Sequence, residues 1–81
     1  MKVEVRLFAY FRDGREKKSI LDLAEGTTPR EVLDAIKIDL DEVSIFLLNG
    51  RDILLNEADG KLDNPLKDND VIALFPPVGG G

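Results

Sequence analysis

The segment VIALFPP occupies residues 71–77 of an 81-residue sequence. Residues 71–75 are all apolar, a pattern that predicts a central strand buried on both faces of its sheet. Pro76 and Pro77 have no backbone N–H to give to a sheet, so the strand is expected to end at Phe75. The other predicted elements are then arranged around a central strand that comes last in the sequence.

The first predicted strand covers residues 2–11, where apolar and polar residues alternate and Ala9 still falls on the apolar face. Asp13-Gly14 follows, and this pair favours a two-residue hairpin turn because both residue types tolerate positive φ. A second strand is therefore expected to return over about residues 16–23, antiparallel to the first.

A helix is predicted from Thr28 to about Ile38. Thr28 can cap the first turn, Pro29 suits the first helical position, and Glu31 completes the S/T-x-x-E capping box. Because this helix is short, it has to be held by packing on a sheet rather than by helix propensity.

Two shorter strands are predicted at residues 44–49 and 52–55, and Asn49-Gly50 between them is a turn signal. The order of elements predicts an α+β domain, in which one main helix crosses one face of a mixed sheet. A compact sheet then pairs the first strand with the last strand in parallel, near its middle.

The composition narrows the classes of function. The sequence has no cysteine and no histidine, which removes thiolate and imidazole groups as nucleophiles and metal ligands. Its net charge of −5 argues against nucleic acid as a partner, and no apolar run is long enough to span a membrane. The acidic stretches at 39–42 and 68–70 are expected to be solvated turns rather than metal sites. No secretory signal pattern is present, so a cytoplasmic location is expected.

Residues 76–81 are expected to form an extended tail on a domain of residues 1–75. The diproline favours extended backbone, and the three glycines after it have no Cβ atoms. Another protein's backbone and a nucleotide phosphate can therefore approach the terminal carbonyl group closely. We expect Gly81 to be the reactive group, with Gly79 and Gly80 as the segment that threads into a partner enzyme.

Three groups of residues match a known family: Leu7-Phe8-Ala9 with Arg12 near the start, Asn49-Gly50 in the middle, and PLKDNDVIALFPPVGGG at residues 65–81. On these residues the sequence resembles the MoaD/ThiS family of β-grasp sulfur carriers, which also includes the thiamine-pathway carrier and ubiquitin-like modifiers. Within this family, the Phe-Pro-Pro-Val ending resembles that of the small subunit of molybdopterin synthase.

Two features depart from the family pattern. Asp68-Asn69-Asp70 stands where Asp-Gly-Asp is usual, a change that is tolerable because Asn adopts positive φ more readily than most residues. The segment between the first two strands is also short, so the extra short helix that many relatives have there is expected to be absent.

The resemblance implies a β-grasp (ubiquitin-like) fold and a function at the tail. It implies that a ubiquitin-activating-type adenylyltransferase uses ATP to adenylate Gly81, and that sulfur transfer then produces a thiocarboxylate. The sulfur would go to the dithiolene of molybdopterin inside a catalytic large subunit, in a heterotetramer with two carriers. Phe8, Phe75, Val78 and Arg12 are implied at the partner interface. No bound cofactor, no metal and no catalytic side chain are expected in this chain.

Several alternatives stay open from the sequence. One is a ubiquitin-like modifier that forms isopeptide bonds through Gly81, another is a sulfur carrier of a different pathway such as thiamine synthesis, and a third is a β-grasp interaction module with an inert tail. The final metal, molybdenum or tungsten, and the activating enzyme are open as well. Phe8 and Phe75 fit a core position as well as a docking position.

Overall fold

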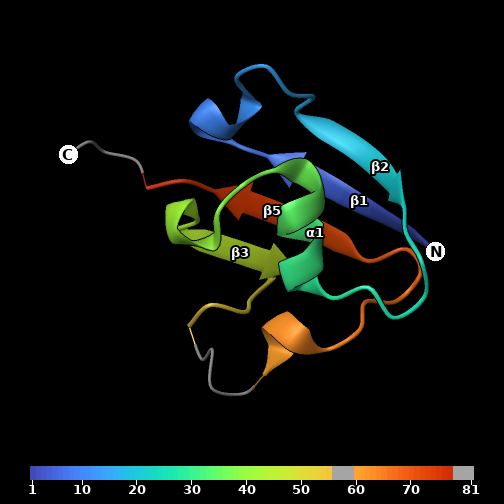
Figure 1. Ribbon diagram of the computed structural model, residues 1–81. Coiled ribbons are helices and arrows are strands. Elements are labelled where there is room, and N and C mark those ends of the chain that lie inside the picture. Colours follow the sequence, from blue (N-terminus) through green and yellow to red (C-terminus); the bar gives the residue numbers. More distant parts are fainter. Residues whose placement is uncertain (56–59, 78–81) are drawn as a thin grey trace.

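The computed structural model describes residues 1–55 and 60–77. They form a mixed five-stranded sheet with one α-helix, α1, across one face (Figure 1). The strand order is β2-β1-β5-β3-β4, so the strand that comes last in the sequence lies in the middle of the sheet. The predicted α+β architecture is confirmed.

A parallel pair of strands forms the centre of the sheet. β1 (Lys2–Leu7) lies beside β5 (Val71–Phe75), and Val5 pairs with Ile72. β2 (Lys18–Asp22) is antiparallel to β1 on one side, and β3 (Ile45–Leu48) is antiparallel to β5 on the other. The predicted parallel pairing of the first strand with the last is confirmed.

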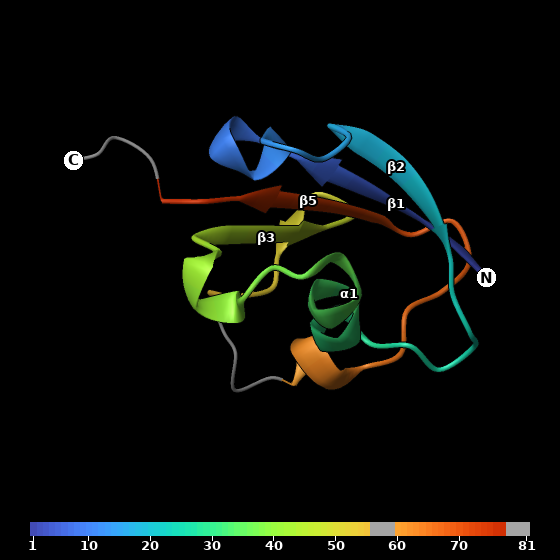
Figure 2. The ribbon, with the colours of Figure 1, turned by 45° about the horizontal axis from the view of Figure 1, so that its top comes forward.

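The hydrophobic core lies between the sheet and α1 (Figure 2). Its buried members come from the strands, from α1 and from the connecting segments: Val3, Val5, Leu7, Phe11, Val32, Leu33, Ile38, Val43, Phe46, Ile53, Leu62, Leu66, Ile72 and Leu74.

β5 differs from the prediction that both of its faces are buried. Ile72 and Leu74 are fully buried toward α1, whereas Val71, Ala73 and Phe75 are only half-buried on the opposite face. An unbroken apolar run does not show which face the helix covers, and only one face is covered here. The sheet therefore has a second, open face that carries apolar side chains.

α1 (Pro29–Ile36) begins where the sequence predicted. The Thr28 hydroxyl accepts a hydrogen bond from the Glu31 backbone N–H at 3.2 Å, and the Glu31 carboxylate accepts one from the Thr28 N–H at 3.0 Å. The helix ends two residues before the predicted Ile38, because Lys37 adopts the left-handed conformation with φ +61°. Ile38 then turns back into the core.

Three predictions for the connection between β1 and β2 are wrong. β1 ends at Leu7 instead of continuing to residue 11, and a short 3-10 helix, η1 (Ala9–Arg12), follows. η1 lies between the first two strands, where no short helix was expected. Asp13-Gly14 lies inside a connection of residues 8–17 and does not form a two-residue hairpin.

Tertiary packing explains this difference. β5, which pairs with β1, ends at Phe75. Pro76 comes next and has no backbone N–H, so it could not pair with a longer β1. The chain turns at Ala9, with φ +53°, and this turn buries the Phe11 side chain, which is 2 % exposed. Ala9 itself is exposed, contrary to its predicted place on the apolar face.

The turn at Asn49-Gly50 is confirmed, because both residues have positive φ and join β3 to β4 (Arg51–Asp52). β4 is shorter than the strand predicted at 52–55. The Asp52 carboxylate accepts a hydrogen bond from the Leu54 N–H at 2.8 Å, and this local turn ends the strand.

The acidic turn at residues 68–70 joins separate parts of the chain. Asn69 has φ +71°, as its substitution for glycine requires. Asp68 accepts a hydrogen bond from the Lys2 N–H at 2.7 Å, and Asp70 accepts one from the Asn49 amide at 2.9 Å. Asn49 in turn accepts one from the Val71 N–H at 2.8 Å. These carboxylates are satisfied by protein donors, which supports their interpretation as turn residues.

A surface ion pair links α1 to the 3-10 turn η4 (Lys61–Asp63). Arg30 Nε lies 2.9 Å from Asp63 Oδ1. The Arg30 guanidinium, hydrogen-bonded to Asp63, holds the pKa of that carboxyl group below its ordinary value.

We predict that Lys37→Gly stabilises the protein. Lys37 is exposed, and its left-handed backbone is strained by a Cβ atom that glycine lacks. Urea unfolding should show a free energy of unfolding raised by about 0.5 to 1 kcal/mol, after the larger unfolded-state entropy of glycine is included. Lys37→Ala is the matched control, since it removes the same side chain but keeps Cβ. Equal stability of the two variants would contradict the explanation.

Candidate functional site

The root of the tail is fixed to the body of the domain. β5 ends at Phe75, whose carbonyl oxygen accepts a hydrogen bond from the Ser44 N–H at 2.8 Å. Pro76 is fully buried, and Pro77 is exposed. Gly79, Gly80 and Gly81, which the sequence singles out as the threading and reactive residues, lie outside the described residues, as does Val78.

Two aromatic rings are stacked beside this root. The Phe8 and Phe75 ring centroids are 4.3 Å apart, and the ring planes differ by 7°. The backbone places both rings, because the Phe8 N–H donates to the Leu74 carbonyl at 3.1 Å as the chain leaves β1. Both side chains are half-buried, so the stack is part of the surface rather than of the core.

Arg12 completes this arrangement. Its Nε donates to the Leu7 carbonyl oxygen at 2.7 Å, and its guanidinium carbon lies 5.2 Å from the centroid of the Phe8 ring. The position is set by η1, the element that the sequence did not predict. The structure thus brings Phe8, Phe75 and Arg12 together, as the sequence suggested for a shared interface.

The open face of β3 and β5 extends this surface. Ile45 pairs with Phe75 and is 39 % exposed, and Leu47 pairs with Ala73. We call Phe8, Phe75, Ile45, Leu47 and Ala73 the open-face patch. The sequence reasoning missed its last three members. The signal for Ile45 and Leu47 was their alternation with buried Phe46, which the continuous apolar run at 45–48 concealed.

The described residues beside the root of the tail offer an apolar surface. Among residues 1–55 and 60–77, no three acidic side chains come close enough to hold a metal ion. In the same part of the chain, no helix is long and apolar enough to cross a membrane. A hollow of about 480 Å³ lies near the start of β1 and β5, at the other end of the open face from the Phe8–Phe75 stack. The arrangement can dock an apolar partner surface next to the point where the tail begins.

Solved structures share this fold. A candidate molybdopterin converting factor subunit 1 from Pyrococcus furiosus is 32% identical, with a TM-score of 0.73 over 96% of this chain and 99% of that chain. A chain in the complex of subunits 1 and 2 of molybdopterin-converting factor from Helicobacter pylori 26695 is 32% identical, with a TM-score of 0.63 over the whole of both chains. SAMP1 from Haloferax volcanii is 26% identical, with a TM-score of 0.72, also over both whole chains.

The fold and these similarities define a ubiquitin-like β-grasp protein. The sequence profile described as the ThiS family matches residues 5–81, and no curated protein is similar enough in sequence to count as a match. The chain belongs to the ThiS family, the MoaD/ThiS group of sulfur carriers and ubiquitin-like proteins.

We predict that the two rings of the stack are energetically coupled. A double-mutant cycle with Phe8→Leu, Phe75→Leu and the double variant should give a coupling free energy of about 0.5 to 1.5 kcal/mol in urea unfolding, as for other aromatic pairs. Tyr10→Leu is a control, because Tyr10 is exposed and its ring contacts Phe11 rather than the stack. Additive effects of the two stack substitutions would show that the rings are merely neighbours.

Proposed function

We propose that this protein is a sulfur carrier of the molybdopterin synthase small-subunit type and that Gly81 carries the sulfur as a thiocarboxylate. The observation that carries the proposal is the Phe8–Phe75 stack at the end of β5, beside the segment that leads to the glycines. A partner bound to the open-face patch would receive residues 78–81 directly. Membership in the ThiS family and 32% identity to molybdopterin converting factor chains support it.

The proposed chemistry begins with activation of the Gly81 carboxylate. A free carboxylate is ionised at neutral pH and is a poor electrophile. An adenylyltransferase of the ubiquitin-activating type would join one carboxylate oxygen to the α-phosphorus of ATP and release pyrophosphate. A sulfur donor equivalent to hydrosulfide would then attack the carbonyl carbon and expel AMP, which leaves a thiocarboxylate.

The thiocarboxylate sulfur would next attack a carbon of the molybdopterin precursor in the large subunit and displace an oxygen substituent. Water would then cleave the acyl–sulfur bond, which leaves the sulfur on the precursor and restores the Gly81 carboxylate. A dithiolene holds two sulfur atoms, so one product consumes two charged carriers. This chain would provide the sulfur and the docking surface, and the partners would provide the catalytic side chains. The Helicobacter pylori structure, a complex of subunits 1 and 2, supports a partner of the large-subunit type.

A second candidate function is protein modification, in which Gly81 forms an isopeptide bond with a lysine. It is favoured by the similarity to SAMP1, a small archaeal modifier protein, over the whole length of both chains. Both functions begin with the same adenylate. They differ in the final acceptor, which is a cofactor precursor in one and a lysine amine in the other.

The absence of cysteine gives a direct test of the thiocarboxylate. We expect that incubation with the cognate activating enzyme, ATP and a sulfur donor, followed by a thiol-alkylating reagent, adds one alkyl group that maps to Gly81 by mass spectrometry. The variant that lacks Gly81 is the control. If no adduct forms while the enzyme converts a known carrier, the sulfur carrier proposal fails. Gly81-dependent conjugates on lysines would then support the modifier.

We also predict that Gly80→Phe abolishes sulfur transfer but leaves the fold intact. A large side chain next to Gly81 would block a channel that fits only backbone, and residue 80 lies beyond the folded strand. Unfolding in urea should change by less than about 0.5 kcal/mol, as at surface positions without special features. Ala35→Phe, at an exposed position of α1, serves as the control for an added surface aromatic residue. Full transfer by Gly80→Phe would contradict the proposed threading.

A further inference from the structure

The outer edge of β2 is open in the part of the chain that the structure describes. β2 pairs with β1 on its inner side, and Figures 1 and 2 show no other segment of residues 1–55 and 60–77 along its outer side. An open strand edge presents unpaired N–H and C=O groups, which are a template for another strand.

The hydrogen bonds to β1 show which residues face outward. The Leu7 N–H donates to the Lys17 carbonyl at 2.8 Å, and the Leu23 N–H donates to the Met1 carbonyl at 2.7 Å. Hydrogen-bonded and non-bonded pairs alternate along an antiparallel ladder. With the observed register, the backbone groups of Ser19 and Leu21 face β1. Those of Lys18, Ile20 and Asp22 therefore face the open edge.

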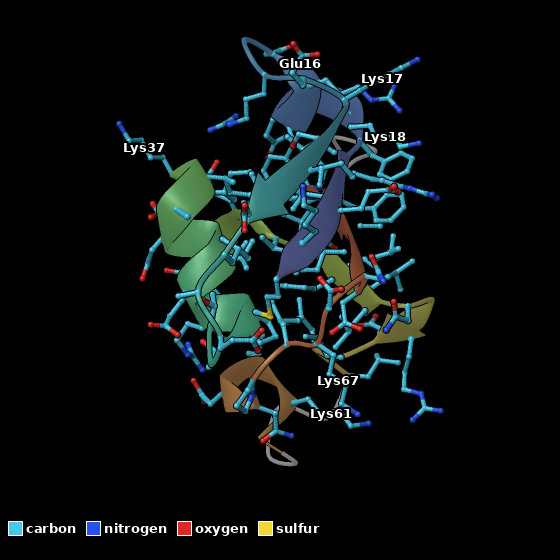
Figure 3. All side chains as sticks on the ribbon, turned by 90° about the vertical axis from the view of Figure 1, so that its right-hand side faces the viewer. Glu16, Lys17, Lys18, Lys37, Lys61 and Lys67 are labelled. Carbon is cyan, nitrogen blue, oxygen red and sulfur yellow. The ribbon has the colours of Figure 1, made fainter. Side chains whose placement is uncertain are left out.

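The outward residues on the two sides of Ile20 carry opposite charges. Lys18 and Asp22 lie two residues before and after it, and all three side chains are exposed on the open face. Figure 3 shows Glu16, Lys17 and Lys18 together at the start of the strand. With Arg15, this end carries a net positive charge, and the other end carries Asp22 and Glu25. Two such edges complement each other only when they run antiparallel.

We propose that β2 pairs with β2 of a second copy of this chain, antiparallel and centred on Ile20. In this register Ile20 pairs with Ile20 of the second copy, and Lys18 pairs with Asp22 of the second copy in both directions. Each of the three outward residues gives and accepts backbone hydrogen bonds. The same register that pairs the backbone groups also brings opposite charges together on one face, where cross-strand pairs stabilise a sheet.

Lys18 and Asp22 already contact charged groups of their own chain, and pairing of the two β2 strands keeps these contacts. Lys18 Nζ lies 3.8 Å from Glu4 Oε1, and Asp22 Oδ1 lies 3.7 Å from the N-terminal ammonium group. Lys18 and Asp22 are themselves exposed, so each can share its charge with a second copy. Ile20 is 57 % exposed, and in the dimer Ile20 of the second copy would shield its side chain from water.

The other edge of the sheet limits the assembly to a dimer. β4 has only two residues, and the Leu54 N–H next to it is already bound by the Asp52 side chain. Two copies joined at β2 therefore form a closed two-fold pair instead of a fibre. Both open-face patches lie on the same side of the combined sheet. Because the contact is small, we expect a weak dimer, with a dissociation constant of about 0.1 to 1 mM.

The charge pattern provides the test, in the full chain and at concentrations up to about 2 mM. By sedimentation equilibrium, Lys18→Asp and Asp22→Lys should each weaken self-association by about tenfold or more, because each places like charges opposite each other. A one-to-one mixture of the two variants should dimerise again, since all charge pairs are then complementary. A folding defect in either variant would not be repaired by mixing. Arg51→Asp makes the same change in net charge as Lys18→Asp, but it lies on β4 at the opposite edge of the sheet and should associate as the original protein does.

Amide hydrogen exchange adds a readout with single-residue resolution. The Ser19 and Leu21 amides should be protected at every concentration, because they bind β1. The Lys18, Ile20 and Asp22 amides should gain protection only as concentration rises. A monomer at 2 mM, equal association of the single variants and the original protein, or a mixture that stays monomeric would each overturn the proposal. None of these outcomes depends on whether Gly81 carries sulfur, so the two proposals are tested separately.

Discussion

Parallel pairing of β1 with β5 joins the start of the chain to its end, and a tight turn cannot make such a connection. The connection from β1 to β5 must therefore return the chain to the end of the sheet where β1 began, and α1, which is part of this connection, covers one face of the sheet. The pairing also places the exit of β5 beside the exit of β1. Phe75 and Phe8 can stack only because β5 and β1 end side by side at the same end of the sheet. The fold and the candidate site thus have one geometric origin.

Polar side chains where β1 and β5 begin stabilise this pair of strands. Asp68 and Asp70 receive backbone and amide donors from β1 and from the β3–β4 turn, and Asn49 bonds both Asp70 and Val71. Two turns and the start of β1, which are distant in sequence, are thereby held together at the start of the central strands. The acidic character of this turn serves backbone geometry, and the Phe8–Phe75 stack lies at the opposite end of the open face.

Local signals in the sequence predicted the elements that local interactions determine. The capping box of Thr28 and Glu31 and the Asn49-Gly50 turn are examples, because each depends on residues within a few positions. The course of residues 8–17 could not be predicted in the same way, since it depends on burial of Phe11 and on the end of β5. Phe8 and Phe75 were found as site residues by resemblance, whereas Arg12 owes its position to the unpredicted η1. Ile45 and Leu47 were missed because both faces of β3 are apolar.

The burial of Pro76 has a mechanical consequence. Under the proposed function, an enzyme that drew the tail into its own channel would apply force to Pro77 and, through buried Pro76, to β5. β5 is bonded on both sides, to β1 and to β3, so this load shears two ladders at once instead of peeling one strand from an edge. Shear distributes force over all the hydrogen bonds of a strand together. Under the proposed function, the domain would therefore resist traction in the direction in which a partner pulls it.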